Sequence, residues 1–299
     1  MRLDRWLADK VPNLGRRRAK QWCESGKVTV NGRIADKNLR LTIGTQICYE
    51  FPAERRAVQN FALDLDVRLE TPLLVVVHKP PGQATVPLDS EDSSALVNGL
   101  LARYPETQTL GANALEAGLV HRLDNGTSGL LLAARTEVAF TVLRRALRQG
   151  HIKKEYVAIA HDGGLAETGT IDLPLRPGRH NARRMVVAHD GQRGARKAQT
   201  HYDVIERQAN WVVAQVTAGP ALRHQIRAHF AALGCPLVND ELYGAPRHEG
   251  LAAGRHALHA RRIVWEGNEV VPAFDCLAPL TDDLATLLRE LGFRTSLCP

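Results

Sequence analysis

The amino-acid sequence predicts an α+β protein, in which a small N-terminal α/β module precedes a large domain with a mixed, largely antiparallel sheet. The 299 residues are enough for one large domain and one small one. Charge divides the chain in the same way, because residues 1–60 hold 13 Lys and Arg against six Asp and Glu, whereas the later residues hold 26 of each. From residue 73, short apolar runs typical of strands have stretches of helical periodicity between them, from which we predict mixed α+β architecture.

The bulk composition excludes several classes of protein. Hydrophobic residues make up 44% of the chain and charged residues 24%, the usual balance of a globular protein with a core. The sequence contains no run of 18 apolar residues, the length that a membrane-spanning helix needs. Its charged start lacks the apolar core of a signal peptide. The cysteines are odd in number and lack a Cys-x-x-Cys pair, which favours buried thiols over disulfides or a zinc site: Cys23, Cys48, Cys235, Cys276 and Cys298. We therefore expect a cytoplasmic monomer without metal or cofactor.

Residues 1–50 form the expected module, with two helices and a small sheet. Leu3, Trp6 and Leu7 have helical spacing, and a second helix is predicted over residues 16–24. A strand over residues 27–30 runs into the turn pair Asn31-Gly32, and another strand is predicted over residues 45–50. Basic residues gather at the second helix and the first strand: Arg16, Arg17, Arg18, Lys20 and Lys27. They predict either a docking surface for a polyanion or an ordinary solvated face.

Two patterns in this module resemble the S4-type RNA-binding module. They are Arg2-Leu3-Asp4 at the start and Gly26-x-Val28-x-Val30-Asn31-Gly32 further on. The resemblance covers residues 1 to about 50 and implies that the basic residues contact RNA.

The rest of the chain divides into a linker and a large domain. Residues 51–68 mix charges with isolated apolar residues and are assigned to a linker, so the large domain spans residues 69–299. Its expected elements are strands over residues 73–77, 130–133, 156–160 and 211–216, and helices over residues 138–147 and 222–233. The second helix should end at Gly234, with Pro236 beyond it.

The segment 119–132 consists of two apolar arms around a polar turn that contains Asp124. Asn125-Gly126 is a strong hairpin signal, so Asp124 could simply precede a turn. The density of His, Arg, Asp, Thr and Ser between two apparently buried strands points instead to a functional site. The residues alone leave both readings open.

Six ordered motifs resemble the RluA-like pseudouridine synthases. His121-Arg122-Leu123-Asp124-x-x-Thr127-Ser128-Gly129 is similar to the catalytic motif of that family. The other matching segments are residues 77–82, 154–156, 224–227, 234–244 and 258–260. The resemblance spans roughly residues 70–265 and implies an enzyme that isomerises uridine in structured RNA to pseudouridine.

Carried over residue by residue, the resemblance implies three catalytic residues. Asp124 is the carboxylate that opens the glycosidic bond, Tyr156 packs on the target base, and Arg227 pairs with Asp124. A carboxylate suits this chemistry because breaking the bond to ribose develops positive charge at the anomeric carbon. A uridine inside folded RNA must be flipped out, and Arg122 is a candidate for the side chain that fills the vacated space.

Further RNA contacts are expected outside the catalytic motif. Lys79 stands at a strand exit that Pro80, Pro81 and Gly82 make rigid. Arg179 and Arg183 lie in a second basic cluster with Arg176 and Arg184, which predicts either phosphate contacts or a solvated loop. Large-subunit ribosomal RNA is favoured as the substrate over transfer RNA.

Other interpretations remain open at this point. A catalytically silent RNA-binding or assembly protein could share the fold, and a nucleosidase or glycosidase would need a second catalytic carboxylate. His121 is expected to orient its neighbours rather than act as a base, and Ser128 lacks the Gly-x-Ser-x-Gly context of a hydrolase. His224 is expected to be structural rather than a metal ligand. The family pattern is altered over residues 219–223, just before His224, and this stretch determines where Arg227 lies.

Overall fold

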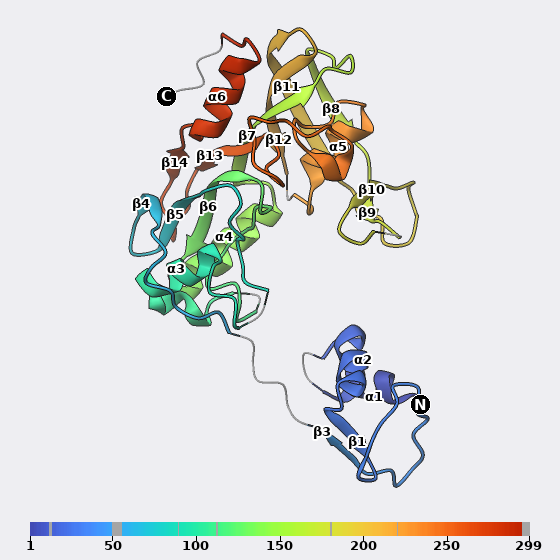
Figure 1. Cartoon of the computed structure of the whole chain (residues 1–299). Helices are drawn as coiled ribbons and strands as arrows, with labels where there is room; N and C mark the ends of the chain where they lie inside the picture. The colour runs from blue at the N-terminus through green and yellow to red at the C-terminus, as the bar shows by residue number, and fades with distance from the viewer. Residues whose placement is uncertain are drawn as a thin grey trace. The chain divides into compact units, whose positions relative to one another are not determined.

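The computed structural model describes residues 1–11, 14–49, 56–88, 90–111, 113–179, 181–219 and 221–294, apart from the side chains of Arg17 and Arg18. The chain divides into two compact units, Met1–Glu54 and Arg55–Pro299. Figure 1 traces the elements of both units. Within the described residues, no helix has the length and apolar character needed to cross a membrane.

The N-terminal unit packs two helices on a small antiparallel sheet. Helix α1 (Leu3–Lys10) and helix α2 (Arg16–Glu24) contact each other and bury Leu3, Leu7 and Trp22. The sheet has the order β2–β1–β3, from Arg33–Ile34, Val28–Val30 and Ile47–Tyr49. Asn31 and Gly32 both have positive φ, 50° and 76°, as a two-residue turn between twisted strands requires.

The second unit is built on one large sheet whose strands are labelled in Figure 1. Its order is β4–β5–β6–β13–β7–β12–β11–β8, and β14 pairs with β13 on a side branch. The strands are Asp66–Glu70 (β4), Leu74–Lys79 (β5), Ser128–Ala134 (β6), Lys153–His161 (β7), Thr168–Asp172 (β8), Gln199–Gln208 (β11), Trp211–Ala218 (β12), Leu258–Trp265 (β13) and Phe274–Leu277 (β14). Every pairing is antiparallel except β6 with β13, so the sheet is mixed and largely antiparallel, as predicted.

Helices cover both faces of this sheet because its central strands are apolar on both sides. Helix α3 (Leu96–Arg103) and helix α5 (Gln225–Ala232) belong to the core cluster on one face. Helix α4 (Glu137–Arg148) and helix α6 (Asp282–Glu290) pack in the two clusters of the other face. Strand β6 is buried along its whole length, which explains its unbroken run of small and apolar residues.

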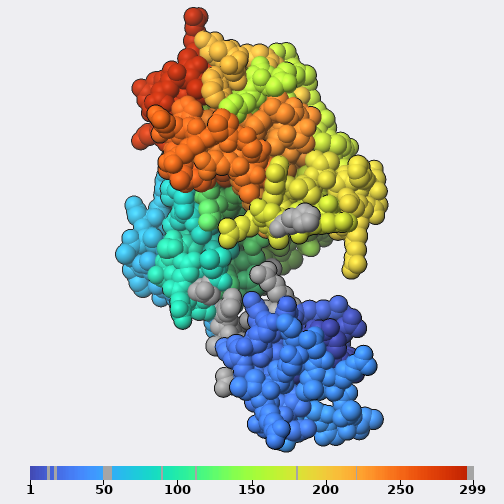
Figure 2. All heavy atoms as spheres, turned by 45° about the vertical axis from the view of Figure 1, so that its right-hand side comes forward, coloured from blue at the N-terminus to red at the C-terminus, as the bar shows by residue number. Residues whose placement is uncertain are grey.

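Four shorter elements complete the second unit. Strands β9 (Leu175–Pro177) and β10 (Met185–Val187) form a two-stranded antiparallel hairpin that projects from the unit in Figures 1 and 2. Two single 3₁₀ turns follow helices of the sheet body, η1 (Pro105–Thr109) after α3 and η2 (Glu241–Tyr243) after α5.

The structure differs from the sequence prediction at several points of the fold. Part of the expected linker is folded, since Asp66–Arg68 belong to β4 and Ala57 and Leu65 are buried, whereas residues 51–55 lie outside the described residues. The strand expected over residues 45–50 is shorter, and Glu50 also lies outside that part. The helix expected from residue 222 begins at Gln225. Cys48 is exposed rather than buried, whereas Cys23, Cys235 and Cys276 are buried free thiols.

Candidate active site

Asp124 and Arg227 come from distant parts of the chain and meet in an ion pair. Asp124 lies in the loop before β6, and Arg227 lies in the first turn of α5. The Arg227 Nη1 donates to Asp124 Oδ2 at 3.0 Å. The Asp124 side chain keeps about a fifth of its surface exposed, whereas that of Arg227 is almost fully buried. The carboxylate is therefore the accessible member of the pair.

A second carboxylate, Asp240, fixes the guanidinium of Arg227. Arg227 Nε and Nη2 donate to the two oxygens of Asp240 at 2.7 and 2.8 Å, in the bidentate geometry that suits an Arg–carboxylate pair. The ring of Tyr243, in η2 just after Asp240, lies 5.1 Å from the same guanidinium. Burial alone would lower the pKa of Arg227, but the hydrogen bonds and charges of Asp240 and Asp124 raise it above its ordinary value. Arg227 is thus a permanently charged, immobile donor facing Asp124.

Side-chain hydrogen bonds at the start of α5 place Arg227. His224 adopts the left-handed conformation (φ 54°) as the N-cap, so the helix begins one residue later. The Gln225 side chain accepts from Leu222 N and donates to Gln199 O and Thr200 Oγ1, which joins the first turn to β11. The altered sequence before His224 is compatible with the Arg227–Asp124 pair.

Buried polar groups hold the backbone on both sides of Asp124. Before it, Thr85 Oγ1 donates to Leu123 O at 2.7 Å. After it, Asn125 O accepts from Gly82 N at 2.8 Å and from the Lys79 ammonium at 3.1 Å. Thr127 N donates to Asp124 O at 3.0 Å, which closes the turn. These hydrogen bonds fix the backbone of the loop and so hold the Asp124 carboxylate in place.

A turn forms at Asn125-Gly126, but it differs from the hairpin turn that this residue pair favours. Neither residue has positive φ, so the turn is not of the type that Asn-Gly favours in hairpins. The arms still meet, since Val120 N donates to Leu132 O at 2.9 Å. Gly126 is required for another reason, because a Cβ atom there would overlap the backbone oxygen of Gly254. The close approach of two loops, rather than hairpin geometry, explains this glycine.

Lys79 was expected to contact RNA, but the structure places it inside the protein. Its side chain is fully buried, and its ammonium donates to the carbonyl oxygens of Pro80, Gln83 and Asn125 at 2.7, 2.9 and 3.1 Å. Burial lowers its pKa to about 7, with Arg255 acting in the same direction and Asp124 opposing it. Because the rigid turn after β5 folds back over the ammonium, Lys79 supports the Asp124 loop instead of facing solvent.

Tyr156 lies in β7 and is 5% exposed. It pairs with Ala260 of β13, which in turn pairs with Gly129 of β6. Two strand spacings, about 10 Å, therefore separate the backbone of Tyr156 from the end of the Asp124 motif. Tyr156 also belongs to the same core cluster as Leu123 and Ile226, the residues that precede Asp124 and Arg227. Strand order brings these three sequence motifs to one region of the sheet.

Two histidines lie near the site: His121 is buried, and His224 is partly buried. His121 Nε2 accepts from Leu132 N at 3.2 Å, so its ring has no free lone pair for proton transfer. Burial lowers the pKa of His121 well below its ordinary value, with Lys154 and Arg144 adding to the effect. His224 Nε2 lies 3.8 Å from Asp124 Oδ1, and burial lowers the pKa of His224 although Asp124 opposes this. His121 is therefore not poised to act as a base.

The expected RNA-contacting arginines lie at the surface. Arg122 has 60% of its side chain exposed and lies 3.9 Å from Glu116. Arg179 and Arg183 are exposed on the β9–β10 hairpin, which Tyr243 ties to the site because its hydroxyl accepts from Met185 N at 2.9 Å. In the N-terminal unit, Arg16, Lys20 and Lys27 are exposed, whereas the side chains of Arg17 and Arg18 lie outside the description.

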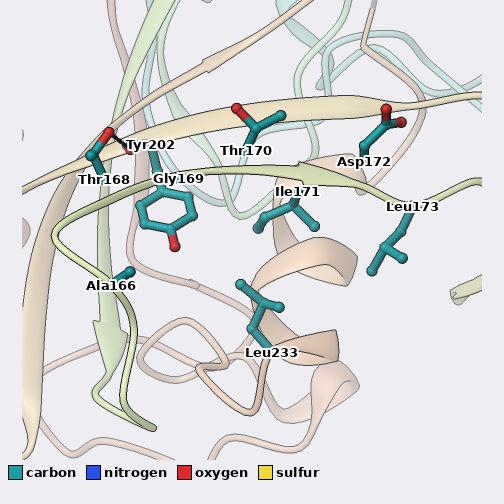
Figure 3. Close-up of a pocket in the computed structure, with 9 residues that line it drawn as sticks. All are labelled: Ala166, Thr168, Gly169, Thr170, Ile171, Asp172, Leu173, Tyr202 and Leu233. Atoms are coloured by element: carbon teal, nitrogen blue, oxygen red, sulfur yellow. Dashed lines mark hydrogen bonds between the residues drawn. The ribbon is translucent and has the colours of Figure 1, made fainter.

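A pocket beside the edge strand β8 shares no residue with this site. Figure 3 shows its lining, which includes Thr168, Ile171 and Leu173 with Tyr202 of β11 and Leu233 after α5. The lining is mostly apolar, and Asp172 is its one carboxylate. This composition does not suit a polyanion.

Several residues that build the site were not predicted from the sequence. Asp240 and Tyr243 lie within a family motif but had no predicted role, and Arg255 and His256 lie outside the motifs. The available signals were an acidic residue within a family motif, Asp240, and a basic pair before an apolar strand, Arg255-His256. Only the fold shows that these segments lie against the Asp124 loop.

The comparisons with known proteins agree with this fold. The family model described as RNA pseudouridylate synthase matches residues 73–232, and that of the S4 domain matches residues 1–47. The chain is 32% identical to an uncharacterised RNA pseudouridine synthase of Bacillus subtilis, over 97% of this chain and 94% of that protein. It is also 32% identical to ribosomal large subunit pseudouridine synthase D of Neisseria meningitidis, over 99% and 80% of the two chains. The fold resembles human RNA pseudouridylate synthase domain containing 4, with a TM-score of 0.59, 21% identity and coverage of 75% and 92%.

These matches place the chain among the RNA-modifying isomerases, and its mixed sheet agrees with that class. The chain belongs to the RNA pseudouridylate synthase family and carries an N-terminal S4 domain. It is an RNA pseudouridine synthase, and the resemblance that the six sequence motifs indicated is confirmed.

Proposed function

We propose that this enzyme converts specific uridines of large-subunit ribosomal RNA to pseudouridine, with Asp124 as the catalytic carboxylate. The observation that supports it best is the Asp124–Arg227–Asp240 arrangement, in which a partly exposed carboxylate faces a guanidinium fixed by a second, buried carboxylate. Relatives named ribosomal large subunit pseudouridine synthase D, which match over nearly the whole chain, support the choice of RNA.

The proposed chemistry breaks one bond and forms another without changing the atoms present. Asp124 attacks the anomeric carbon, or stabilises the positive charge that develops there, as the bond to uracil N1 breaks. The freed uracil turns within the site and forms a new bond from its carbon 5 to the anomeric carbon. On the covalent route, this step breaks the ester bond and returns Asp124 as a carboxylate. The proton on carbon 5 is then released, and N1 takes up a proton. Arg227 keeps Asp124 oriented through the cycle by its hydrogen bond to the carboxylate.

Two further groups complete the proposed site. Tyr156 packs on the detached base, since Ala260 of β13 pairs both with Tyr156 and with Gly129 at the end of the Asp124 motif. Arg122 fills the space left when the nucleotide is flipped out, because its long side chain is exposed two residues from the carboxylate. Arg179 and Arg183 on the hairpin and Arg16, Arg17, Arg18, Lys20 and Lys27 of the N-terminal module bind phosphates.

The RNA carrying the target is found by mapping pseudouridines in total RNA from cells with and without this protein. Loss of modified positions in large-subunit ribosomal RNA alone is the expected result. If pseudouridines disappear from transfer RNA alone, the substrate is transfer RNA rather than ribosomal RNA, and the proposed activity stands. Unchanged modification everywhere would favour the alternative of a silent assembly protein.

Neutralising Lys20 and Lys27 together should reduce the slope of log affinity against log salt by about 2, and an unchanged slope would contradict their role in binding.

A further inference from the structure

One buried guanidinium, that of Arg255, connects the Asp124 loop to the C-terminal helix. Arg255 is 2% exposed and precedes β13. On one side, its Nη1 donates to Gly126 O at 2.7 Å and its Nη2 donates to Ser128 Oγ at 3.0 Å. On the other side, its Nη2 contacts Thr281 Oγ1 at 3.2 Å and its Nε donates to Asp283 Oδ2 at 2.7 Å. Thr281 is the N-cap of α6, and Asp283 lies in its first turn.

Every donor of this side chain is used, which fixes its position. Nη1 also contacts the carbonyl oxygens of His256 and Leu258 at 2.9 and 3.1 Å, within its own segment. The five N–H groups of a guanidinium lie in one plane, so six acceptors around it define one orientation. Burial lowers the pKa of Arg255, while the hydrogen bond and charge of Asp283 raise it. Asp283 is its one carboxylate partner among the described residues.

The neighbours of Arg255 hold the same loop. Thr127 Oγ1 and His256 Nε2 are 2.7 Å apart, and Ser128 Oγ lies 2.9 Å from His259 Nδ1. Consecutive residues of the Asp124 motif are therefore bound to residues 255–259, between two backbones so close that Gly126 tolerates no side chain. A displacement of Arg255 would move the turn that Asp124 begins.

Helix α6 gives this connection a rigid base. Leu284, Leu287 and Leu288 pack in a core cluster with Val157 and Ile159 of β7, the strand that carries Tyr156. Arg255, Thr281 and Asp283 all lie beyond residue 232, where the match to the RNA pseudouridylate synthase model ends. A C-terminal segment outside the matched region thus contacts the loop of the proposed nucleophile.

We propose that Arg255 is a positioning residue for Asp124, and that its bond to Asp283 makes helix α6 part of the active-site support. Arg255 does not touch the substrate. It sets the distance between Asp124 and the reacting carbon by holding Gly126 and Ser128 against α6. The inference rests on the proposed role of Asp124, and it is tested with one measurement that needs no catalysis and one that does.

The measurement without catalysis is hydrogen exchange over residues 121–129 in the full-length protein. Arg255→Lys keeps the charge but offers three donors without the planar fork, so it cannot serve both the loop and α6. Asp283→Asn removes the charge that pairs with Arg255, and it does so at a side chain 29% exposed, where the risk to folding is small. We expect the amide of Thr127, which bonds to Asp124 O, to exchange about tenfold faster in both variants, a loss of about 1.4 kcal/mol in protection.

The catalytic measurement is tritium release from RNA labelled at uridine carbon 5. We expect kcat to fall about 100-fold in Arg255→Lys and about tenfold in Asp283→Asn, with KM within twofold of the wild type, because a displacement of about 1 Å can have effects of this size. Arg262→Lys is the matched control: it makes the same substitution at an arginine 38% exposed, which pairs with Asp275 and Glu155 at the surface. This control should change neither readout.

Wild-type loop exchange in both variants would overturn the positioning role, whatever the activity. Faster exchange with unchanged kcat would also overturn it, since the loop would move without affecting Asp124. A wild-type protein that releases no tritium would refute the proposed function instead, while the exchange comparison would still decide whether Arg255 holds the loop. Should Arg255→Lys fail to fold, Asp283→Asn decides between the same outcomes by the same two readouts.

Discussion

Replacing Asp240 by Asn tests how much the Asp124–Arg227 pair depends on its buried support. Asp240→Asn preserves the shape of the side chain but removes its charge and one of the two acceptors of Arg227. The remaining amide would place a donor against a guanidinium N–H. Arg227 would then turn toward Asp124, its one remaining carboxylate among the described residues.

The expected loss of unfolding free energy in Asp240→Asn follows from the burial of its ion pair with Arg227. Breaking a buried ion pair by removing one partner costs about 3–5 kcal/mol. Arg227 keeps Asp124 as a partner, so we expect the lower end, about 3 kcal/mol of unfolding free energy. For a unit of this size, the melting temperature should drop by about 6–12 °C. A displaced guanidinium should reduce kcat by about 100-fold.

Single-turnover tritium release and thermal unfolding measure the two effects. Asp275→Asn is the matched control, because Asp275 makes the same bidentate pair with Arg262 at a half-exposed position. An exposed pair contributes only about 0–1 kcal/mol, so this variant should behave as the wild type. Equal losses in the two variants would refute the argument that burial gives Asp240 its role.

Three further predictions concern other parts of the site. Lys79→Met leaves the carbonyls of Pro80 and Gln83 without this donor and should lower the free energy of unfolding in urea by about 2–6 kcal/mol. The exposed control Lys153→Met should change it by less than about 1 kcal/mol, and similar losses would contradict the support role of Lys79. Burial lowers the pKa of His259 to about 3, so between pH 6.5 and 3 the unfolded state binds the extra proton. The unfolding free energy should thus fall as pH falls, by about 1.4 kcal/mol per unit for this residue, and His259→Gln should reduce the measured slope by that amount. An identical slope in the variant would show that His259 is protonated in the folded protein. Arg122→Ala should slow turnover on folded RNA more than on an unstructured fragment, and equal slowing on both would count against base-flipping.

Local sequence signals predicted most of the fold. Helix α2 spans Arg16–Glu24 as predicted, because Gly15 and Gly26 border a run of strong helix formers. The apolar run of β6 predicted a buried strand, and Gly234 ends α5 with positive φ. The start of α5 was wrong by three residues because His224 takes a left-handed conformation that its sequence does not signal.

Long-range contacts explain what the sequence left undetermined. Asp124 and Arg227 were paired only through the resemblance, and nothing local indicates that Asp240 holds Arg227 from the side. The sequence around Lys79 predicts an exposed lysine. The structure buries it because the chain after Pro80 folds back over its ammonium. Arg255 donates hydrogen bonds to Gly126 and Asp283, which lie more than 150 residues apart in the sequence, so only the three-dimensional arrangement reveals this connection.

The most direct test of the proposed mechanism compares wild type and Asp124→Asn in tritium release from labelled large-subunit ribosomal RNA, with RNA affinity measured in parallel. Asn keeps the size of the side chain and can still accept a hydrogen bond from Arg227, but it is no longer an anionic nucleophile. We predict that wild type releases tritium, and that Asp124→Asn binds the RNA with unchanged affinity but releases none above background. Release by Asp124→Asn at the wild-type rate would contradict the assignment of Asp124 as the catalytic carboxylate.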